Sequence, residues 1–378
     1  MDFSFEVSKS DPTGARLGLL TTPHGAIETP VFMPVGTAAT VKALTQDALE
    51  ELGVGIILAN TYHLYLRPGH ELIRKLGGLH AFMSWRKAIL TDSGGYQVFS
   101  LAELRKITDE GVRFRSHLDG SEHLLTPEKA AEIQLALGSD IAMVLDECIE
   151  TPAPREIAES ALKRTTAWAA RARNYFLEHA NRNGNASQWQ FGIVQGATFA
   201  DLRRESARQL LDLQFPGYAV GGLAVGEPHE LTCDMTAEVT ALLPKEKPRY
   251  LMGVGRPEQI PDYVAGGIDM MDCVLPTRAA RHACLYTSEG RLLIKNKRYI
   301  EDQRPIDPHC HCAVCRRYTR AYLRHLFAAG EITAAILATH HNVQFYLDIM
   351  RQVREAISFE QLANFASELR ARYAAGPA

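Results

Sequence analysis

Eight short segments rich in apolar and β-forming residues recur along the chain, and this repeat constrains the fold more than any other feature. Most of the segments are continuous apolar runs rather than alternating ones, which is typical of parallel strands buried on both faces. Helical patterns separate them, as in residues 126–138, where Thr126, Pro127 and Glu128 supply the signals of a helix start. The expected strands are residues 31–35, 55–60, 88–92, 140–146, 190–196, 217–222, 249–255 and 268–276.

Strand and helix alternating eight times predict an α/β fold, a (β/α)8 TIM barrel. An open doubly wound sheet is the second interpretation, but no G-x-G-x-x-G motif opens a helix after the first strand. Three segments lie outside the repeat: a leading hairpin at about 3–22, a hairpin at about 112–125 around an Asp-Gly pair, and a cysteine-bearing subdomain at about 284–345. Because no low-complexity linker is visible, we expect one domain over residues 1–378 that contains all three.

The composition argues against several classes of protein. A hydrophobic content of 46% and a charged content of 22% are typical of a globular protein, and no apolar run approaches the ~20 residues of a membrane span. The N-terminus lacks the basic and apolar stretches of a signal peptide. Seven cysteines, four of them scattered, argue against a secreted disulfide framework, so we expect the protein to reside in a reducing cytoplasm.

The distribution of charge points to a nucleic-acid partner, although the net charge of −3 does not. Between Arg278 and Arg324 there are eleven Lys and Arg residues against four Asp and Glu residues. A local basic patch of this kind fits a phosphate backbone, and a solvated charged surface explains it equally well.

Polar side chains mark the ends of the expected strands, where the active site of a barrel enzyme lies. Asp272 stands inside an apolar run, and a buried carboxylate costs several kcal/mol unless a partner compensates it. A capping or ion-paired Asp is the simplest interpretation of one such residue, but three strands that each end in Asp favour a polar pocket. When one of two carboxyl groups is protonated and the other is ionised, the first can act as an acid and the second as a nucleophile, as in covalent glycosyl transfer. The strand ends are Gly36, Asn60, Asp92, Asp146, Gln195, Gly222, Gly255 and Asp272.

The stretch TDSGGYQVF at residues 91–99 follows the third expected strand. Gly94 and Gly95 would let a ligand approach the backbone, and Tyr96 could stack on a ring. A packed core aromatic is an equally good interpretation of Tyr96. Nothing in the chain indicates a redox cofactor.

The motif Cys310-x-Cys312-x2-Cys315 predicts a metal site, because three thiols so close together are rarely structural in a reducing compartment. The fourth ligand is expected from His340 or His341 on a helix, and spacing alone does not choose between them. Three Cys and one His form a closed, structural zinc site, whereas an iron–sulfur cluster usually takes a fourth Cys. Weaker candidates, crowded against the cysteines, are His309 and His311.

Ten motifs follow one another along the chain: MPVGTAATVKALT, NTYHLYLRPG, TDSGGYQVFSL, SHLDGS, DEC, GIVQG, GGLAVGE, YLMGVGRPE, DCVLPTR and CxCxxC with a following His. Their order and spacing resemble the bacterial queuine tRNA-ribosyltransferase family, also called tRNA-guanine transglycosylase, from about residue 3 to beyond 345. The resemblance implies a role in queuosine biosynthesis. Guanine at the wobble position of G-U-N anticodons would be replaced by the precursor base 7-aminomethyl-7-deazaguanine, through a covalent Asp–ribosyl intermediate.

The resemblance also implies roles for individual residues. Asp272 would be the nucleophile that attacks the ribose anomeric carbon, and Asp92 would be the general acid and base. Asp146 would accept two purine N–H groups, since a carboxylate can take two parallel hydrogen bonds. Tyr96 and Met252 would sandwich the ring, and Gln195 and Gly222 would hold its carbonyl side. The full set of base-binding positions is Asp92, Ser93, Gly94, Gly95, Tyr96, Asp146, Gln195, Gly222, Leu223 and Met252.

The partners and the cofactor are likewise implied by the resemblance. The anticodon loop of tRNA would be bound, because its bases can be splayed out into a pocket. The chain would be a cytoplasmic homodimer that touches no membrane, holds one structural Zn2+ ion per chain and needs no organic cofactor. The zinc ligands would be Cys310, Cys312, Cys315 and His341. The RNA-binding positions would be Gly253, Val254, Gly255, Arg256, Pro257, Glu258, Gln259, Thr277, Arg278, Ala279, Ala280 and Arg281.

Two positions depart from the family pattern: Ala197 stands where Gly is common, and Ala279 stands where Asn is common. Cys148 and Val225 resemble the bacterial form, which takes the precursor base rather than queuine, and no extra C-terminal RNA-binding domain is expected. The alternatives are a barrel glycosidase that acts on free glycosides and a non-catalytic tRNA-binding subunit. The basic segment argues against the first, and the three acids together argue against the second.

Overall fold

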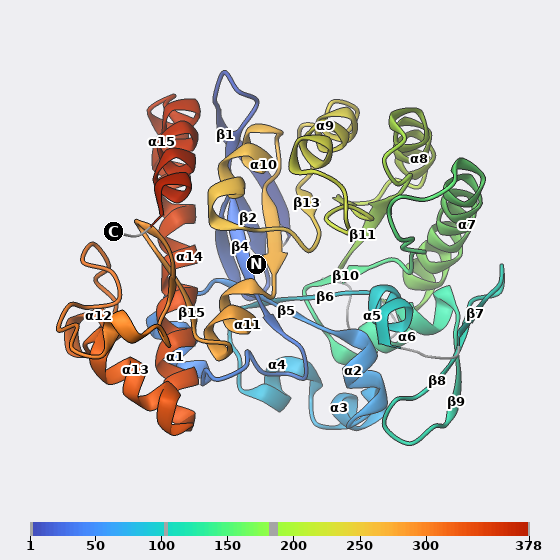
Figure 1. Cartoon of the computed structure of the whole chain (residues 1–378). Helices are drawn as coiled ribbons and strands as arrows, with labels where there is room; N and C mark the ends of the chain where they lie inside the picture. Colours follow the sequence, from blue (N-terminus) through green and yellow to red (C-terminus); the bar gives the residue numbers. More distant parts are fainter. Residues whose placement is uncertain (1–2, 102–104, 181–187, 377–378) are drawn as a thin grey trace.

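The computed structural model describes residues 3–101, 105–180 and 188–376, and its centre is a closed barrel of parallel strands (Figure 1). The order around the barrel is β10-β11-β12-β13-β14-β4-β5-β6, and β14 closes it by pairing with β4. The eight predicted strands are therefore confirmed, and the open doubly wound sheet is wrong. The barrel strands are β4 (Val31–Gly36), β5 (Ile56–Ala59), β6 (Ala88–Thr91), β10 (Ile141–Met143), β11 (Trp189–Val194), β12 (Gly217–Val220), β13 (Arg249–Leu251) and β14 (Met270–Cys273).

Helices surround the barrel, as their sequence patterns predict. The hydroxyl of Thr126 accepts the N–H of Lys129 at 3.1 Å and so caps α6, which ends at the left-handed Gly138. No helix in the described part of the chain combines the length and apolarity needed to cross a membrane. These helices are α1 (Gln46–Glu51), α2 (Thr61–Leu66), α3 (His70–Lys75), α4 (Gly78–Met83), α5 (Gly95–Leu101), α6 (Pro127–Leu137), α7 (Arg155–His179), α8 (Ala200–Asp212), α9 (His229–Thr240), η1 (Pro257–Gln259), α10 (Ile260–Ala265) and α11 (Leu275–Arg281).

Both predicted hairpins are present, and each carries a third strand that the sequence pattern did not predict. The first forms the sheet β1 (Ser4–Ser10), β2 (Arg16–Thr22) and β3 (Gly25–Thr29). The second forms the sheet β7 (Arg105–Ile107), β8 (Val112–Arg115) and β9 (Glu122–Leu125). Arg16 ties the first sheet to the barrel by donating to both carboxylate oxygens of Asp269, at 2.8 and 2.6 Å. Asp269 directly precedes β14, so this sheet lies at the N-terminal end of the barrel.

The cysteine-bearing segment forms a subdomain with its own apolar cluster. The long helix α14 is shared: Ala338 belongs to that cluster, whereas Tyr346 and Val353 pack in the barrel core. The expected boundary at about 345 therefore falls inside one continuous helix, which Figure 1 shows running past the barrel. The elements after α11 are β15 (Cys284–Thr287), β16 (Gly290–Leu293), η2 (Lys297–Tyr299), α12 (Ala313–Arg317), α13 (Arg320–Ala329), α14 (Ile332–Ser358) and α15 (Leu362–Ala375). Leu362 and Leu369 of α15 pack in the barrel core.

Candidate active site and metal centre

A cavity of about 340 Å3 opens at the C-terminal ends of the barrel strands. This volume suits a bicyclic base, and the lining mixes apolar side chains with a few convergent polar ones. The three acids predicted at strand ends all line it: Asp92, Asp146 and Asp272, each no more than 9% exposed. The predicted polar pocket is therefore present.

Asp92 directly follows β6 and is held by a ring of donors. Its carboxylate accepts the backbone N–H of Thr61 at 2.8 Å, that of Gly94 at 3.2 Å, and the side-chain amide of Asn60. Burial, opposed by these donors and reinforced by the charge of Asp272, raises the pKa of Asp92 to about 6. A carboxyl with such a pKa can both give and take a proton near neutral pH.

Asp272 is the third residue of β14, and among the described residues neither an arginine nor a lysine forms an ion pair with it. Its Oδ1 accepts the hydroxyl of Tyr250 at 2.6 Å and the backbone N–H of Gly253 at 2.8 Å. Burial raises the pKa of Asp272, and these two hydrogen bonds counteract the rise because they favour the ionised form. The interpretation as a capping or ion-paired Asp is therefore wrong: the structure holds a desolvated carboxylate with one oxygen accepting both hydrogen bonds.

Asp146 and Ser93 form a second polar group in the same cavity, and Gln195, which is buried and does not line the cavity, contacts Asp146. The Gln195 amide donates to Asp146 Oδ2 at 2.7 Å, and the Ser93 hydroxyl donates to Oδ1 at 3.2 Å. Burial raises the pKa of Asp146 to about 6. Gly222 adopts φ +62°, and a β-carbon there would overlap Gln195 Oε1, so glycine is required for this close packing.

The remaining predicted base-binding residues differ in whether they face the cavity or the protein interior. Tyr96 lines the cavity and is 53% exposed, so its interpretation as a packed core aromatic is wrong. Leu223, Met252 and Gly94 also line the cavity. The backbone of Gly95 packs against the backbone of Asp146 and does not line the cavity, since a β-carbon at Gly95 would lie 2.7 Å from the carbonyl oxygen of Asp146.

The two predicted RNA-binding segments flank the mouth of the cavity. Residues 253–259 run from the end of β13 through η1, and residues 277–281 lie in α11, which follows Asp272. Gly253, Arg256 and Arg278 are exposed, and Arg281 is half-buried. The pKa of Arg281 is lowered by burial and by the neighbouring charge of Arg278, as expected for cations that have no carboxylate partner in the part of the chain that the structure describes. Most of the other positions in these segments are buried and shape the rim: Val254, Gly255, Pro257, Thr277 and Ala280.

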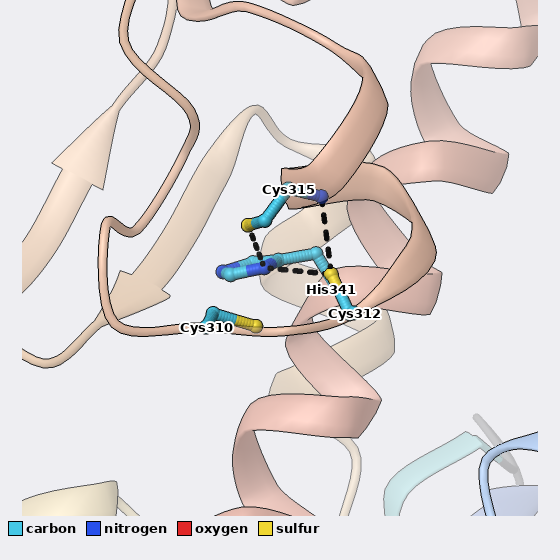
Figure 2. A group of neighbouring side chains, drawn as sticks. All are labelled: Cys310, Cys312, Cys315 and His341. Carbon is cyan, nitrogen blue, oxygen red and sulfur yellow. Dashed lines mark hydrogen bonds between the residues drawn. The ribbon is translucent and has the colours of Figure 1, made fainter.

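The predicted metal ligands come together in the C-terminal subdomain, where all four side chains are buried (Figure 2). His341 Nδ1 lies 3.6 Å from Cys312 Sγ and 3.3 Å from Cys315 Sγ, and Cys310 completes the group. His341 Nε2 donates to the carbonyl oxygen of Tyr286 at 2.8 Å, which leaves Nδ1 free to bind a metal. Three thiols and one imidazole fit a tetrahedral zinc ion, and the geometry selects His341 over His340.

Two other groups of potential metal ligands exist among the described residues, and neither suits an ion. The rings of His24 and His80 stack with centroids 3.6 Å apart and planes 11° from parallel, so no ion beside Asp140 can lie in both ring planes. In the second group, around His70, the ammonium of Lys129 already pairs with Glu132 at 2.8 Å.

Sequence reasoning missed Tyr250 and His63, which both line the cavity. Tyr250 was within reach, because it stands two residues before Met252 and alternate residues of a strand share a face. His63 gave no such signal, since it is the third residue of the helix α2 and becomes part of the site only through the fold.

The comparisons with known proteins agree with one another. The family model described as "Queuine tRNA-ribosyltransferase" matches residues 11–375. A protein of that name from Koribacter versatilis (strain Ellin345) is 60% identical over 363 residues, which cover 94% of each chain. Proteins of the same name from Caldanaerobacter subterraneus subsp. tengcongensis and Pelotomaculum thermopropionicum are 56% and 54% identical, and the matched residues cover 97–99% of each chain.

Proposed function

The chain belongs to the queuine tRNA-ribosyltransferase family and is thus a tRNA-guanine transglycosylase, and from that premise we propose its substrates and mechanism. It exchanges the wobble guanine of G-U-N anticodons for 7-aminomethyl-7-deazaguanine, a step of queuosine biosynthesis. The observation that carries this proposal is the convergence of three buried acids at one mouth of the barrel.

In the first half-reaction, Asp272 attacks C1′ of the ribose. The bond from C1′ to guanine N9 breaks, its electron pair goes to N9, and an ester bond forms between Asp272 and C1′. Asp92 supplies the proton that guanine needs to leave, and a pKa of about 6 lets it carry that proton close to neutral pH.

In the second half-reaction, the incoming base reverses these steps. Asp92, now a carboxylate, removes the proton from N9 of the 7-deazaguanine, and N9 attacks C1′. The ester breaks and Asp272 leaves as a carboxylate, which the Tyr250 hydroxyl and the Gly253 N–H stabilise. Each acid thus ends the cycle in the state in which it began.

Recognition of the base uses the second polar group. Asp146 accepts the ring and amino N–H groups, while the Gln195 amide and the backbone near Gly222 face the carbonyl side. Tyr96 and Met252 bracket the ring from the two sides of the cavity. Cys148 and Val225 also line the cavity, and we take them, by their resemblance to the bacterial form, to accommodate an aminomethyl group rather than the larger queuine.

The metal centre would support, and the arginines at the rim of the cavity would form, the surface that binds tRNA. A zinc ion held by the three cysteines and His341 would cross-link α12 and the loop before it to α14, and so fix the subdomain against the barrel. Arg256, Arg278 and Arg281 would contact the anticodon arm through phosphates or guanine edges. A homodimer would supply grip beyond the anticodon arm; a monomeric mass in light scattering would refute this part.

Incorporation of radiolabelled guanine into unmodified tRNA tests the proposal. Wild-type protein with tRNA bearing a G-U-N anticodon is expected to incorporate label, and the same tRNA with the wobble guanine replaced by adenine is the matched control. The absence of incorporation by folded, zinc-loaded protein would refute the function. Hydrolysis of free glycosides instead would support the glycosidase alternative.

A further inference from the structure

Arg203 on α8 is fully buried directly behind the base-binding residues. Among the described residues, its guanidinium donates hydrogen bonds to three carbonyl oxygens. Its Nε donates to Ala197 at 2.6 Å, and its Nη2 donates to Gly221 at 3.1 Å and to Gly222 at 3.3 Å. Among the described residues no partner is found for Nη1. Burial lowers the pKa of Arg203 only to about 10, so the side chain remains a cation near neutral pH. The charge of Glu227 partly offsets this effect, but no carboxylate within the described ranges forms an ion pair with Arg203. A buried charge without an ion-pair partner is costly, which calls for a reason.

The orientation of the peptide groups supplies that reason. The peptide bonds on both sides of Gly222 are trans, so each N–H points opposite to the C=O of the same peptide. Because Arg203 holds the carbonyls of Gly221 and Gly222, the N–H groups of Gly222 and Leu223 point away from Arg203. Both residues line the cavity, and no backbone acceptor is recorded for either N–H within the described ranges.

The same helix also fixes the neighbouring strand end. Ala197 adopts φ +48°, a left-handed conformation that costs an alanine about 1 kcal/mol, and Arg203 Nε holds its carbonyl. One turn further along α8, the hydroxyl of Ser206 accepts the N–H of Gln195 at 3.1 Å. The ends of β11 and β12 are thus bound to one helix. Gln195, at the end of β11, in turn holds Asp146 through the hydrogen bond from its side-chain amide.

We propose that Arg203 is a positioning residue that aims the Gly222 and Leu223 N–H groups at the carbonyl oxygen of the base and strengthens them as donors. A charge-assisted hydrogen bond to a carbonyl polarises its peptide group, so the N–H at the other end becomes a better donor. This inference rests on the proposed function, because it takes the ligand of the cavity to be a purine with a carbonyl group.

Equilibrium binding of two bases, without tRNA, tests the inference. Guanine carries the carbonyl oxygen, whereas 2-aminopurine lacks both this oxygen and the adjacent N1–H and keeps the exocyclic amine, so each variant is compared with the wild type for the same base. In Arg203→Met, the affinity for guanine is expected to fall about tenfold and the affinity for 2-aminopurine to change less than about twofold. Arg203→Lys, which keeps the charge but not the fork of donors, is expected to lie between Met and wild type.

A matched control is Arg249→Met, because Arg249 is also a buried arginine with a pKa lowered to about 10. It donates to the carbonyl of Leu243 at 2.7 Å, at the opposite end of the barrel, and its loss is expected to leave the preference for guanine unchanged. An unaltered ratio of the two affinities in Arg203→Met would overturn the inference; if that variant does not fold, the ratio in Arg203→Lys decides. Failure of wild-type protein to incorporate guanine into tRNA would instead refute the proposed function.

Discussion

Replacing Tyr250 by Phe removes one of the two hydrogen bonds that favour the ionised form of Asp272 and changes little else in the cavity wall. The hydroxyl donates to Oδ1 at 2.6 Å, and the Gly253 N–H remains at 2.8 Å. A hydrogen bond to a charged group contributes about 1.5 to 3 kcal/mol. Its loss therefore shifts the ionisation equilibrium of Asp272 toward the protonated form by a factor of about 10 to 100.

The sign of the effect follows from the mechanism. In the proposed mechanism Asp272 attacks as a carboxylate, so a variant with a higher pKa at this position is expected to lose activity as the pH falls and to recover it as the pH rises. In Tyr250→Phe the acid limb of kcat/KM for tRNA, measured from about pH 5 to about pH 9, is expected to move to higher pH. The loss at the alkaline plateau is expected to be smaller than the loss at acid pH.

The matched control is Tyr299→Phe, because Tyr299 is a buried tyrosine of the C-terminal subdomain whose hydroxyl has no hydrogen-bond partner in the described part of the chain. Its pH profile is expected to coincide with that of the wild type. If Tyr250→Phe lowers activity equally at every pH, or moves the acid limb to lower pH, the assignment of Asp272 as an attacking carboxylate is refuted.

Three further predictions concern stability, metal and glycine geometry. Since burial raises the pKa of Asp146 from 3.8 to about 6, ionisation opposes folding, and stability is lost as the pH rises through that window. Asp146→Asn is therefore expected to stabilise the free protein at neutral pH by at most about 3 kcal/mol, less at pH 4, while guanine binding is lost; a lower melting temperature at neutral pH would contradict this. Chelation or Cys315→Ser is expected to remove zinc, seen by elemental analysis, and to lower the melting temperature, whereas Cys284→Ser does neither; unchanged stability without metal would refute the structural role. Gly222→Ala is expected to weaken guanine binding at least tenfold, because the β-carbon displaces Gln195, whereas Gly330→Ala, with φ +75° and open space, costs only stability; equal binding by both would contradict the packing argument.

The barrel was predictable because its strands are buried on both faces and therefore read as continuous apolar runs. The predictable part of the site followed from the same fact, since Asp92 and Asp146 directly follow such runs and Asp272 interrupts one. The strands β3 and β7 were missed because they lie in small sheets outside the barrel, where no continuous apolar run marks them. Their existence depends on neighbours brought by the fold.

Residues that act through other residues were the least predictable. Arg203 reads as one of several charged residues on an amphipathic helix, and only the fold turns its guanidinium inward toward three carbonyl oxygens. The choice between His340 and His341 likewise depends on which side of α14 faces the cysteines, and spacing in the sequence does not contain that angle.

The formation of a covalent bond between Asp272 and ribose is the central claim, and it can be measured directly. Wild-type protein would be mixed with unmodified G-U-N tRNA, denatured, digested with nuclease and protease, and mapped by mass spectrometry. A ribosyl ester on the peptide that contains Asp272, absent from Asp272→Asn, is the expected result. An ester on Asp92 or Asp146 would contradict the account. So would the absence of any adduct, after rapid denaturation, from protein that exchanges the base.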